Sequence, residues 1–356
     1  MRADLPAGLW PLFLRLSVED EAPATLPPET LHRLLTCAAE EGLLPLLCHD
    51  PLVPASVREA LIHAPAIRSL YLRRLDLHRQ AARALIDAIG ADTCVFVKGF
   101  EYRYRLYSRP ELRPSADIDV YVPPGRIDDV IARLRSAGYR LAASEGEALW
   151  GTGYYEVGVD IGEVRVEIHR TFGHAVRTAV DYEEIWAKRE LFLAGDFEAR
   201  RLAPLHAMGL HVLNLAKDEL SSPLIRFVDL FLMLRLWPEQ IVPLTALARR
   251  WRIERGLFGS LRVVTSLFPE AGTEVVAEAM ESLLTAGARR FLDRHVLPDR
   301  LRTVSGQVDG RAKQLWRKLW LTDGAGRRAS FFGLWAWRFA LLSVRGPAAA
   351  WGAKAR

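Results

Sequence analysis

Apolar residues recur at helical spacing through the first ninety residues of the chain. Leu31 and Leu34 belong to one such pattern, which ends at Gly42. A longer stripe of leucine, isoleucine and alanine follows and ends at Gly90. Residues three and four apart share one face of a helix, so each pattern predicts a helix that buries one face. We expect residues 1–90 to form an N-terminal helical region.

The period of the pattern then changes from helical to alternating. Residues 93–97 are a short apolar run, and polar and apolar residues alternate through residues 117–122. Two more runs, residues 156–160 and 164–169, predict a hairpin. Alternation with period two is typical of strands that bury one face. Short strands interspersed with short helices indicate a small α/β or α+β domain over residues 91–200.

Helical spacing returns at Pro204. We expect residues 201–310 to form a second helical domain and residues 311–356 to form a separate basic segment. That segment holds five of the ten tryptophans, interleaved with arginine and lysine. Three interpretations of it stay open. Its tryptophans pack a final helix onto the body, or a basic amphipathic helix makes a peripheral membrane contact, or its aromatic rings bind RNA or a peptide partner.

Composition restricts the class of protein. The 356 residues are 50% hydrophobic and 26% charged, which is typical of a globular protein with more than one folded unit. The three cysteines form no CxxC pair, and their odd number argues against a disulfide framework, so we expect a reduced, cytoplasmic setting. The longest apolar run, residues 331–344, is shorter than the roughly 20 residues that span a bilayer. The net charge of +5 mildly favours anionic partners such as nucleotides, without favouring nucleic acid.

The strongest chemical signal is the sequence Asp117-Ile118-Asp119. Alternate residues of a strand point to the same face, so both carboxylates leave one side of the sheet while Ile118 enters the core. Two carboxylates this close repel each other unless a cation lies between them. A hard divalent cation, which prefers oxygen ligands, suits such a pair.

A third acid lies on another predicted strand. Arg165, Glu167 and His169 face one side of that strand, and the apolar residues face the other. If it lies beside the Asp-Ile-Asp strand, Glu167 completes a cluster of three carboxylates. Such a cluster holds two Mg²⁺ ions about 3.5–4 Å apart, which clamp both oxygens of an in-line displacement. The plainer alternatives are an ion pair between Glu167 and Arg165, and a His169 that caps the strand end.

Basic residues and a glycine precede the acidic strand. Lys98-Gly99 ends one predicted strand and begins a short helix. Glycine lets backbone N–H groups approach a phosphate, and a helix N-terminus favours negative charge. Lys98 adds a point charge, and the fork of Arg113 suits phosphate oxygens. We therefore expect these three residues to bind a triphosphate, with His169 contacting either the nucleotide or a metal-ligating carboxylate.

Taken together, these motifs resemble the bacterial uncharacterised nucleotidyltransferase family, a branch of the polymerase-β-like superfamily. The resemblance rests on the segments FVKGFEYRYRLYSRPELRPSADIDVYV, AGYRL and VEIHRTFG. It implies an α+β fold in which a small mixed-sheet nucleotidyltransferase core is flanked by N-terminal and C-terminal helical regions. The wider superfamily has a Gly-Ser pair in its phosphate turn, whereas this chain has Lys98-Gly99.

The resemblance implies a Mg²⁺-dependent enzyme that moves a nucleotide from an NTP such as ATP onto a hydroxyl and releases pyrophosphate. Asp117, Asp119 and Glu167 are then the catalytic residues and the metal ligands. Members of the family resemble accessory enzymes of biosynthesis, so we expect a small-molecule or peptide acceptor. Two alternatives stay open: a non-catalytic nucleotide-binding or scaffold protein of the same fold, and a nucleotidyltransferase that acts on tRNA or protein.

Overall fold

The computed structural model describes residues 9, 11–13, 28–62, 65–143, 156–173, 177–297 and 311–333. Within these residues, a seven-stranded sheet has the strand order β3-β4-β5-β2-β1-β7-β6. Its strands are β1 (Val95–Val97), β2 (Asp117–Tyr121), β3 (Leu141–Ala143), β4 (Glu156–Ile161), β5 (Val164–His169), β6 (Glu190–Ala194) and β7 (Phe197–Arg201). Strand β2 runs parallel to β5 and β1 runs parallel to β7, whereas the other neighbouring pairs are antiparallel. The sheet is therefore mixed, as the resemblance implies.

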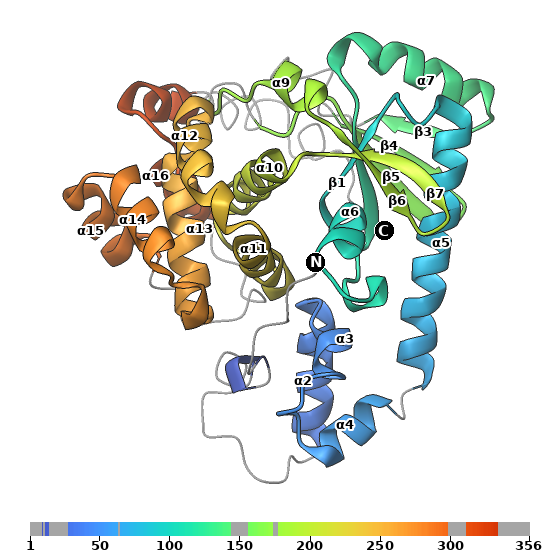
Figure 1. Cartoon of the computed structure of the whole chain (residues 1–356), viewed down its shortest axis with the longest axis horizontal. Helices are drawn as coiled ribbons and strands as arrows, with labels where there is room; N and C mark the ends of the chain where they lie inside the picture. The colour runs from blue at the N-terminus through green and yellow to red at the C-terminus, as the bar shows by residue number, and fades with distance from the viewer. Residues whose placement is uncertain are drawn as a thin grey trace.

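Helices precede, cover and follow this sheet. The first ones are α2 (Pro28–Glu40), α3 (Leu44–Leu47), α4 (Ala55–Ile62) and α5 (Pro65–Ile89). Between and after the strands lie α6 (Lys98–Arg105), η1 (Pro110–Leu112), η2 (Pro124–Arg126), α7 (Ile127–Ser136) and α9 (Tyr182–Ala187). The C-terminal helices are α10 (Pro204–Lys217), α11 (Leu224–Leu236), η3 (Pro238–Gln240), α12 (Ile241–Trp251), α13 (Glu254–Leu267), η4 (Pro269–Ala271), α14 (Glu274–Leu283), α15 (Ala286–His295) and α16 (Arg311–Trp320). An α+β core flanked by helical regions confirms the predicted fold class (Figure 1).

Two hydrophobic cores hold the sheet between layers of helices. On one face, Phe96, Ile118 and Val120 are fully buried in a core that includes residues of α5 and α7. On the other face, Val97 and Tyr121 join a second core with residues of α10 to α13. Figure 1 shows α5 along one side of the sheet, with α10 and α11 on the other and α12 to α15 beyond them. Burial of apolar side chains on both faces holds the strands in place.

Helix α5 ends where the sequence predicts. Gly90 has a φ of 92°, in the left-handed region, and its N–H donates to the carbonyl of Ile86. Glycine adopts this conformation at little cost, which is why it commonly closes a helix. The chain then reaches β1 after a short turn, so the end of α5 fixes where the first strand of the sheet begins.

The described part of the basic C-terminal segment packs onto the helical region. The ring centroid of Trp320 lies 4.3 Å from that of Phe291 on α15 and 5.4 Å from that of Trp316. Leu321 is buried. These contacts favour the packing interpretation over the other two for residues 311–333.

The rest of that segment contains Trp335, Trp337 and Trp351, which lie outside the described residues. None of the described helices, taken alone, combines the length and the apolar character of a membrane span. Helix α11 and the following segment Pro238–Trp251 reach that length and apolar character only together, and they are bent by 95° relative to each other.

His211 on α10 gives the fold a measurable sensitivity to acid. Its Nε2 lies 2.7 Å from the carbonyl oxygen of Arg226, and its ring packs edge-on against Tyr102. Burial lowers the pKa of His211 to about 4, from an ordinary value of 6.5. As the pH falls from about 6.5 toward about 4, His211 becomes protonated in the unfolded chain but stays neutral in the folded chain. We predict that the free energy of unfolding then falls by on the order of 3 kcal/mol.

Urea unfolding between about pH 4 and pH 7.5 measures this contribution when the chain is compared with its His211→Gln variant. The glutamine amide can still donate to the carbonyl of Arg226 but does not titrate. The variant should therefore lose stability less steeply below about pH 6.5. Equal slopes in the two proteins would contradict the prediction.

Candidate active site

Strands β2 and β5 bring acidic residues to one face of the sheet. Parallel pairing places Asp119 opposite Glu167 and Asp117 opposite Arg165. Ile118 lies between the two aspartates and is fully buried in the core on the other face. Residues in register on neighbouring strands point the same way, so the side chain of Glu167 extends beside that of Asp119.

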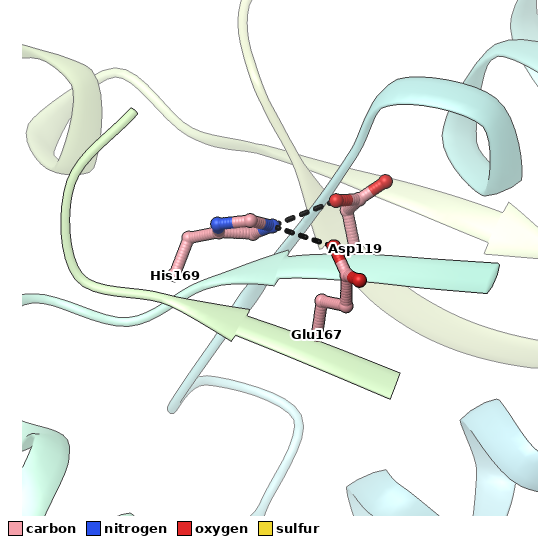
Figure 2. A group of neighbouring side chains, drawn as sticks. All are labelled: Asp119, Glu167 and His169. Atoms are coloured by element: carbon pink, nitrogen blue, oxygen red, sulfur yellow. Dashed lines mark hydrogen bonds and ion pairs between the residues drawn. The ribbon is translucent and has the colours of Figure 1, made fainter. Parts of the chain in front are cut away.

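Asp119, Glu167 and His169 form a compact cluster (Figure 2). One ligand atom from each residue lies within 4.8 Å of the others. The Nε2 atom of His169 is 2.7 Å from Oδ1 of Asp119 and 3.7 Å from Oε2 of Glu167. Asp117 lies outside this closest group, and the hydroxyl of Ser115 is 3.4 Å from its Oδ1 atom.

Lys98 places a positive charge directly against the cluster. Its backbone has a φ of 56°, in the left-handed region, where the chain turns from β1 into α6. The ammonium lies 2.5 Å from Oδ1 of Asp119 and 3.4 Å from Nε2 of His169. A non-glycine residue in this conformation costs roughly 1 kcal/mol or more, which the ion pair offsets. The turn expected to meet a phosphate therefore also directs Lys98 into the acidic site.

The acids of the cluster differ in how readily they hold a proton. Burial opposes ionisation of Asp119, but Lys98 and the hydrogen bond with His169 outweigh it and hold the pKa of Asp119 well below its usual range. Burial, followed by the charge of Glu156 and the aspartates, raises the pKa of Glu167 to about 7. A carboxyl group with such a pKa exchanges a proton readily near neutral pH.

Gly99 allows a close contact between α6 and the loop before β2. A Cβ added at residue 99 would lie 2.5 Å from Oγ of Ser115 and 3.4 Å from the guanidinium of Arg113. Only a residue without a side chain leaves room for that hydroxyl. The Ser115 hydroxyl in turn donates to the backbone carbonyl of Asp117 at 3.0 Å. The glycine thus lets the acidic strand begin directly over the first turn of α6.

Arg113 forms a buried ion pair with Asp229 of α11. Its Nε atom is 2.9 and 3.0 Å from the two carboxylate oxygens, and Nη2 is 2.7 Å from one of them. Asp229 is fully buried and also accepts a hydrogen bond from the hydroxyl of Tyr107 at 2.7 Å. The fork that the sequence analysis assigns to a triphosphate is thus occupied by a carboxylate. Arg113 joins the loop before β2 to the C-terminal helices.

Two basic residues outside the predicted site lie within electrostatic range of its acids. Lys217 ends α10, and Arg226 lies in the first turn of α11. Burial and the charge of Lys98 lower the pKa of Lys217, whereas carboxylates that include Asp119 raise it. Burial and Asp119 raise the pKa of Asp117, and Arg226 is among the groups that counter this. Neither residue belongs to a local motif, because only the packing of helices brings them into that range.

Glu156 is a fourth acid that the sequence analysis does not single out. Antiparallel pairing of β4 with β5 places it opposite His169, and its Oε2 atom is 3.7 Å from Nδ1 of that histidine. It acts more strongly on the pKa of Glu167 than any other charged neighbour. The first position of a hairpin strand carries no pattern that would distinguish it from a surface glutamate.

The donor set suits a hard divalent cation. Asp119 and Glu167 offer carboxylate oxygens from adjacent strands, and Asp117 adds another on the same face. Besides burial, neighbouring carboxylates raise the pKa of Glu167, and a bound cation relieves this repulsion. The residues present therefore fit the metal that the resemblance implies.

Comparison with known protein families gives a match over most of the chain. A family model described as uncharacterised nucleotidyltransferase matches residues 27–269, which is more than half of the chain. The matched range includes Lys98, the acidic strand β2 and Glu167. No curated protein and no solved structure matches the chain.

Loss of the Arg113–Asp229 pair should weaken the fold strongly, because an unpaired charge would remain in the core. We predict that Arg113→Gln lowers the free energy of unfolding by about 3–5 kcal/mol. The matched control is Arg226→Gln, which breaks a half-exposed pair with Asp218 and should cost no more than about 1 kcal/mol. Urea unfolding of both variants makes the comparison, and similar losses would count against the prediction.

Proposed function

The chain belongs to the uncharacterised nucleotidyltransferase family, and from that membership we propose that it is a Mg²⁺-dependent enzyme that transfers a nucleotide from an NTP to a hydroxyl group. The acceptor is a small molecule or a peptide, and pyrophosphate is released. The observation that carries this proposal is the register of β2 with β5, which sets Asp119 beside Glu167. Lys98 lies against the same carboxylates.

Asp117, Asp119 and Glu167 hold the metal in this proposal. When bound, a pair of Mg²⁺ ions neutralises phosphate charge and lowers the pKa of an acceptor hydroxyl. The low pKa of Asp119 supports its role, because a carboxylate that stays ionised is ready to bind a cation. His169 orients Asp119 through its hydrogen bond of 2.7 Å.

The phosphates are held by cations from both halves of the molecule. Lys98 and the backbone N–H groups around Gly99 meet them from the start of α6, where negative charge is favoured. Lys217 and Arg226 approach from the ends of α10 and α11 and take the role that the sequence alone assigns to Arg113. Arg113 instead holds the loop that carries Asp117.

The transfer is an in-line displacement at the α-phosphorus. The acceptor oxygen bonds to phosphorus as the bond from phosphorus to the bridging oxygen breaks, and pyrophosphate leaves with that oxygen. Glu167, whose carboxylate lies beside Asp119, takes the proton of the hydroxyl as general base.

Removing either central carboxylate should abolish transfer without unfolding the chain. We predict that Asp119→Asn and Glu167→Gln each lower pyrophosphate release by at least about a hundredfold. A screen of all four NTPs against candidate hydroxyl acceptors supplies the assay. The matched control is Asp160→Asn, which removes an exposed acid on β4 that pairs with Arg165 and should leave activity unchanged.

Calorimetry with Mg²⁺ and each NTP tests the proposal independently of the acceptor. The wild-type chain should bind at least one NTP, and the Asp119→Asn variant should bind it far more weakly. A wild-type chain that binds none of the four would sink the proposal and favour the scaffold alternative.

Lys217 should affect substrate affinity more than the chemical step. Loss of one charge-assisted contact to phosphate costs about 1.5–3 kcal/mol, so Lys217→Ala should raise the KM for the NTP by roughly tenfold or more. Steady-state kinetics at saturating acceptor measures this, with Lys188→Ala, an exposed lysine directly after α9, as the control. An unchanged KM would remove Lys217 from the nucleotide site.

A further inference from the structure

The turn between α10 and α11 contains two strained residues. Glu219 and Leu220 have φ values of 55° and 60°, and both are buried. Neither is glycine, so this left-handed backbone persists only where surrounding contacts hold it. Lys217, which we place in the nucleotide site, lies directly before this turn. Whatever holds the turn therefore also sets the position of Lys217.

The C-terminal segment contacts Glu219 and shares a packing site with Leu220. The Nζ atom of Lys318 on α16 is 2.8 Å from Oε1 of Glu219. Three residues later, Leu321 lies against Gly259 of α13, and so does Leu220. A Cβ added at Gly259 would lie 2.8 Å from Cδ1 of Leu220 and 3.5 Å from Cδ2 of Leu321. An ion pair from α16 thus holds Glu219, and the next residue, Leu220, packs on α13 at the same glycine as Leu321.

The same segment is anchored on two other elements. Asp323 accepts hydrogen bonds of 2.6 and 3.2 Å from the backbone N–H groups of the first two residues of α13. Arg177, in the connection that follows β5, donates to the hydroxyl of Thr322 at 3.0 Å. Residues 318–323 therefore link α13, the turn after α10 and the connection after the strand that carries Glu167.

We propose that residues 318–323 form a clamp that holds Lys217 at the nucleotide site, with Lys318 as a positioning residue. This inference rests on the proposed function, because it concerns a lysine that binds the NTP. The clamp lies outside residues 27–269, the range that the family model matches. Without the clamp, the strained turn relaxes toward ordinary backbone geometry and moves Lys217 away from the phosphates.

The test compares Lys318→Ala with Lys318→Arg in the full chain. Hydrogen exchange of the backbone amides of residues 217–222 reports on the turn, and steady-state kinetics report on the site. We expect Lys318→Ala to speed this exchange by roughly tenfold and to raise the KM for the NTP by roughly tenfold, with kcat within about twofold. Lys318→Arg keeps the charge and should restore both values.

The matched control is Lys188→Ala, which removes a lysine–glutamate pair of similar length, 3.0 Å, on α9. It should change neither measurement. Unchanged exchange in Lys318→Ala would show that no clamp holds the turn, and faster exchange with an unchanged KM would show that the turn does not position Lys217. Failure of the proposed function gives a different result, because the wild-type chain itself would then bind no Mg²⁺-NTP, and the positioning role would be overturned with it.

Discussion

Carboxylates that lie side by side in a buried site repel each other, and the groups around β2 and β5 offset that repulsion. The ammonium of Lys98 lies 2.5 Å from Asp119, at the end of a strained turn that directs it there. Burial and then the neighbouring carboxylates raise the pKa of Glu167. The charges of Lys98, Asp119 and Glu167 balance only when all three groups are in place. The strand register, the turn and the covering helices must therefore form together.

The face of the sheet on which the acids lie could be predicted from the sequence. Alternation along a strand allows only two orientations, and the buried Ile118 and Val120 assign the aspartates to the opposite face. The turn at Lys98-Gly99 was equally predictable, because a glycine at the junction of a strand and a helix is a local signal. The pairing of β2 with β5 follows neither from the alternation nor from the turn. The prediction of a three-carboxylate cluster assumed this pairing, and the structure shows it.

Long-range partners could not be predicted in this way. Arg113 has the side chain of a phosphate ligand, yet its carboxylate partner, Asp229, lies 116 residues further along the chain. Lys217 and Arg226 come within electrostatic range of the acids only because α10 and α11 pack against the α/β region. The hairpin of β6 and β7 was missed because it forms a sheet edge where exposed Leu191 and Leu193 obscure the apolar alternation.

The ion pair between Arg113 and Asp229 has a consequence for the order in which the chain matures. A nascent chain emerges from the ribosome N-terminus first, so the sheet is complete at β7 before α11 appears. Until then the guanidinium of Arg113 lacks its partner Asp229, and the loop that leads into β2 is not anchored. Synthesis of α11 is thus the event that anchors the loop before β2, and it makes the placement of that loop depend on the C-terminal helices.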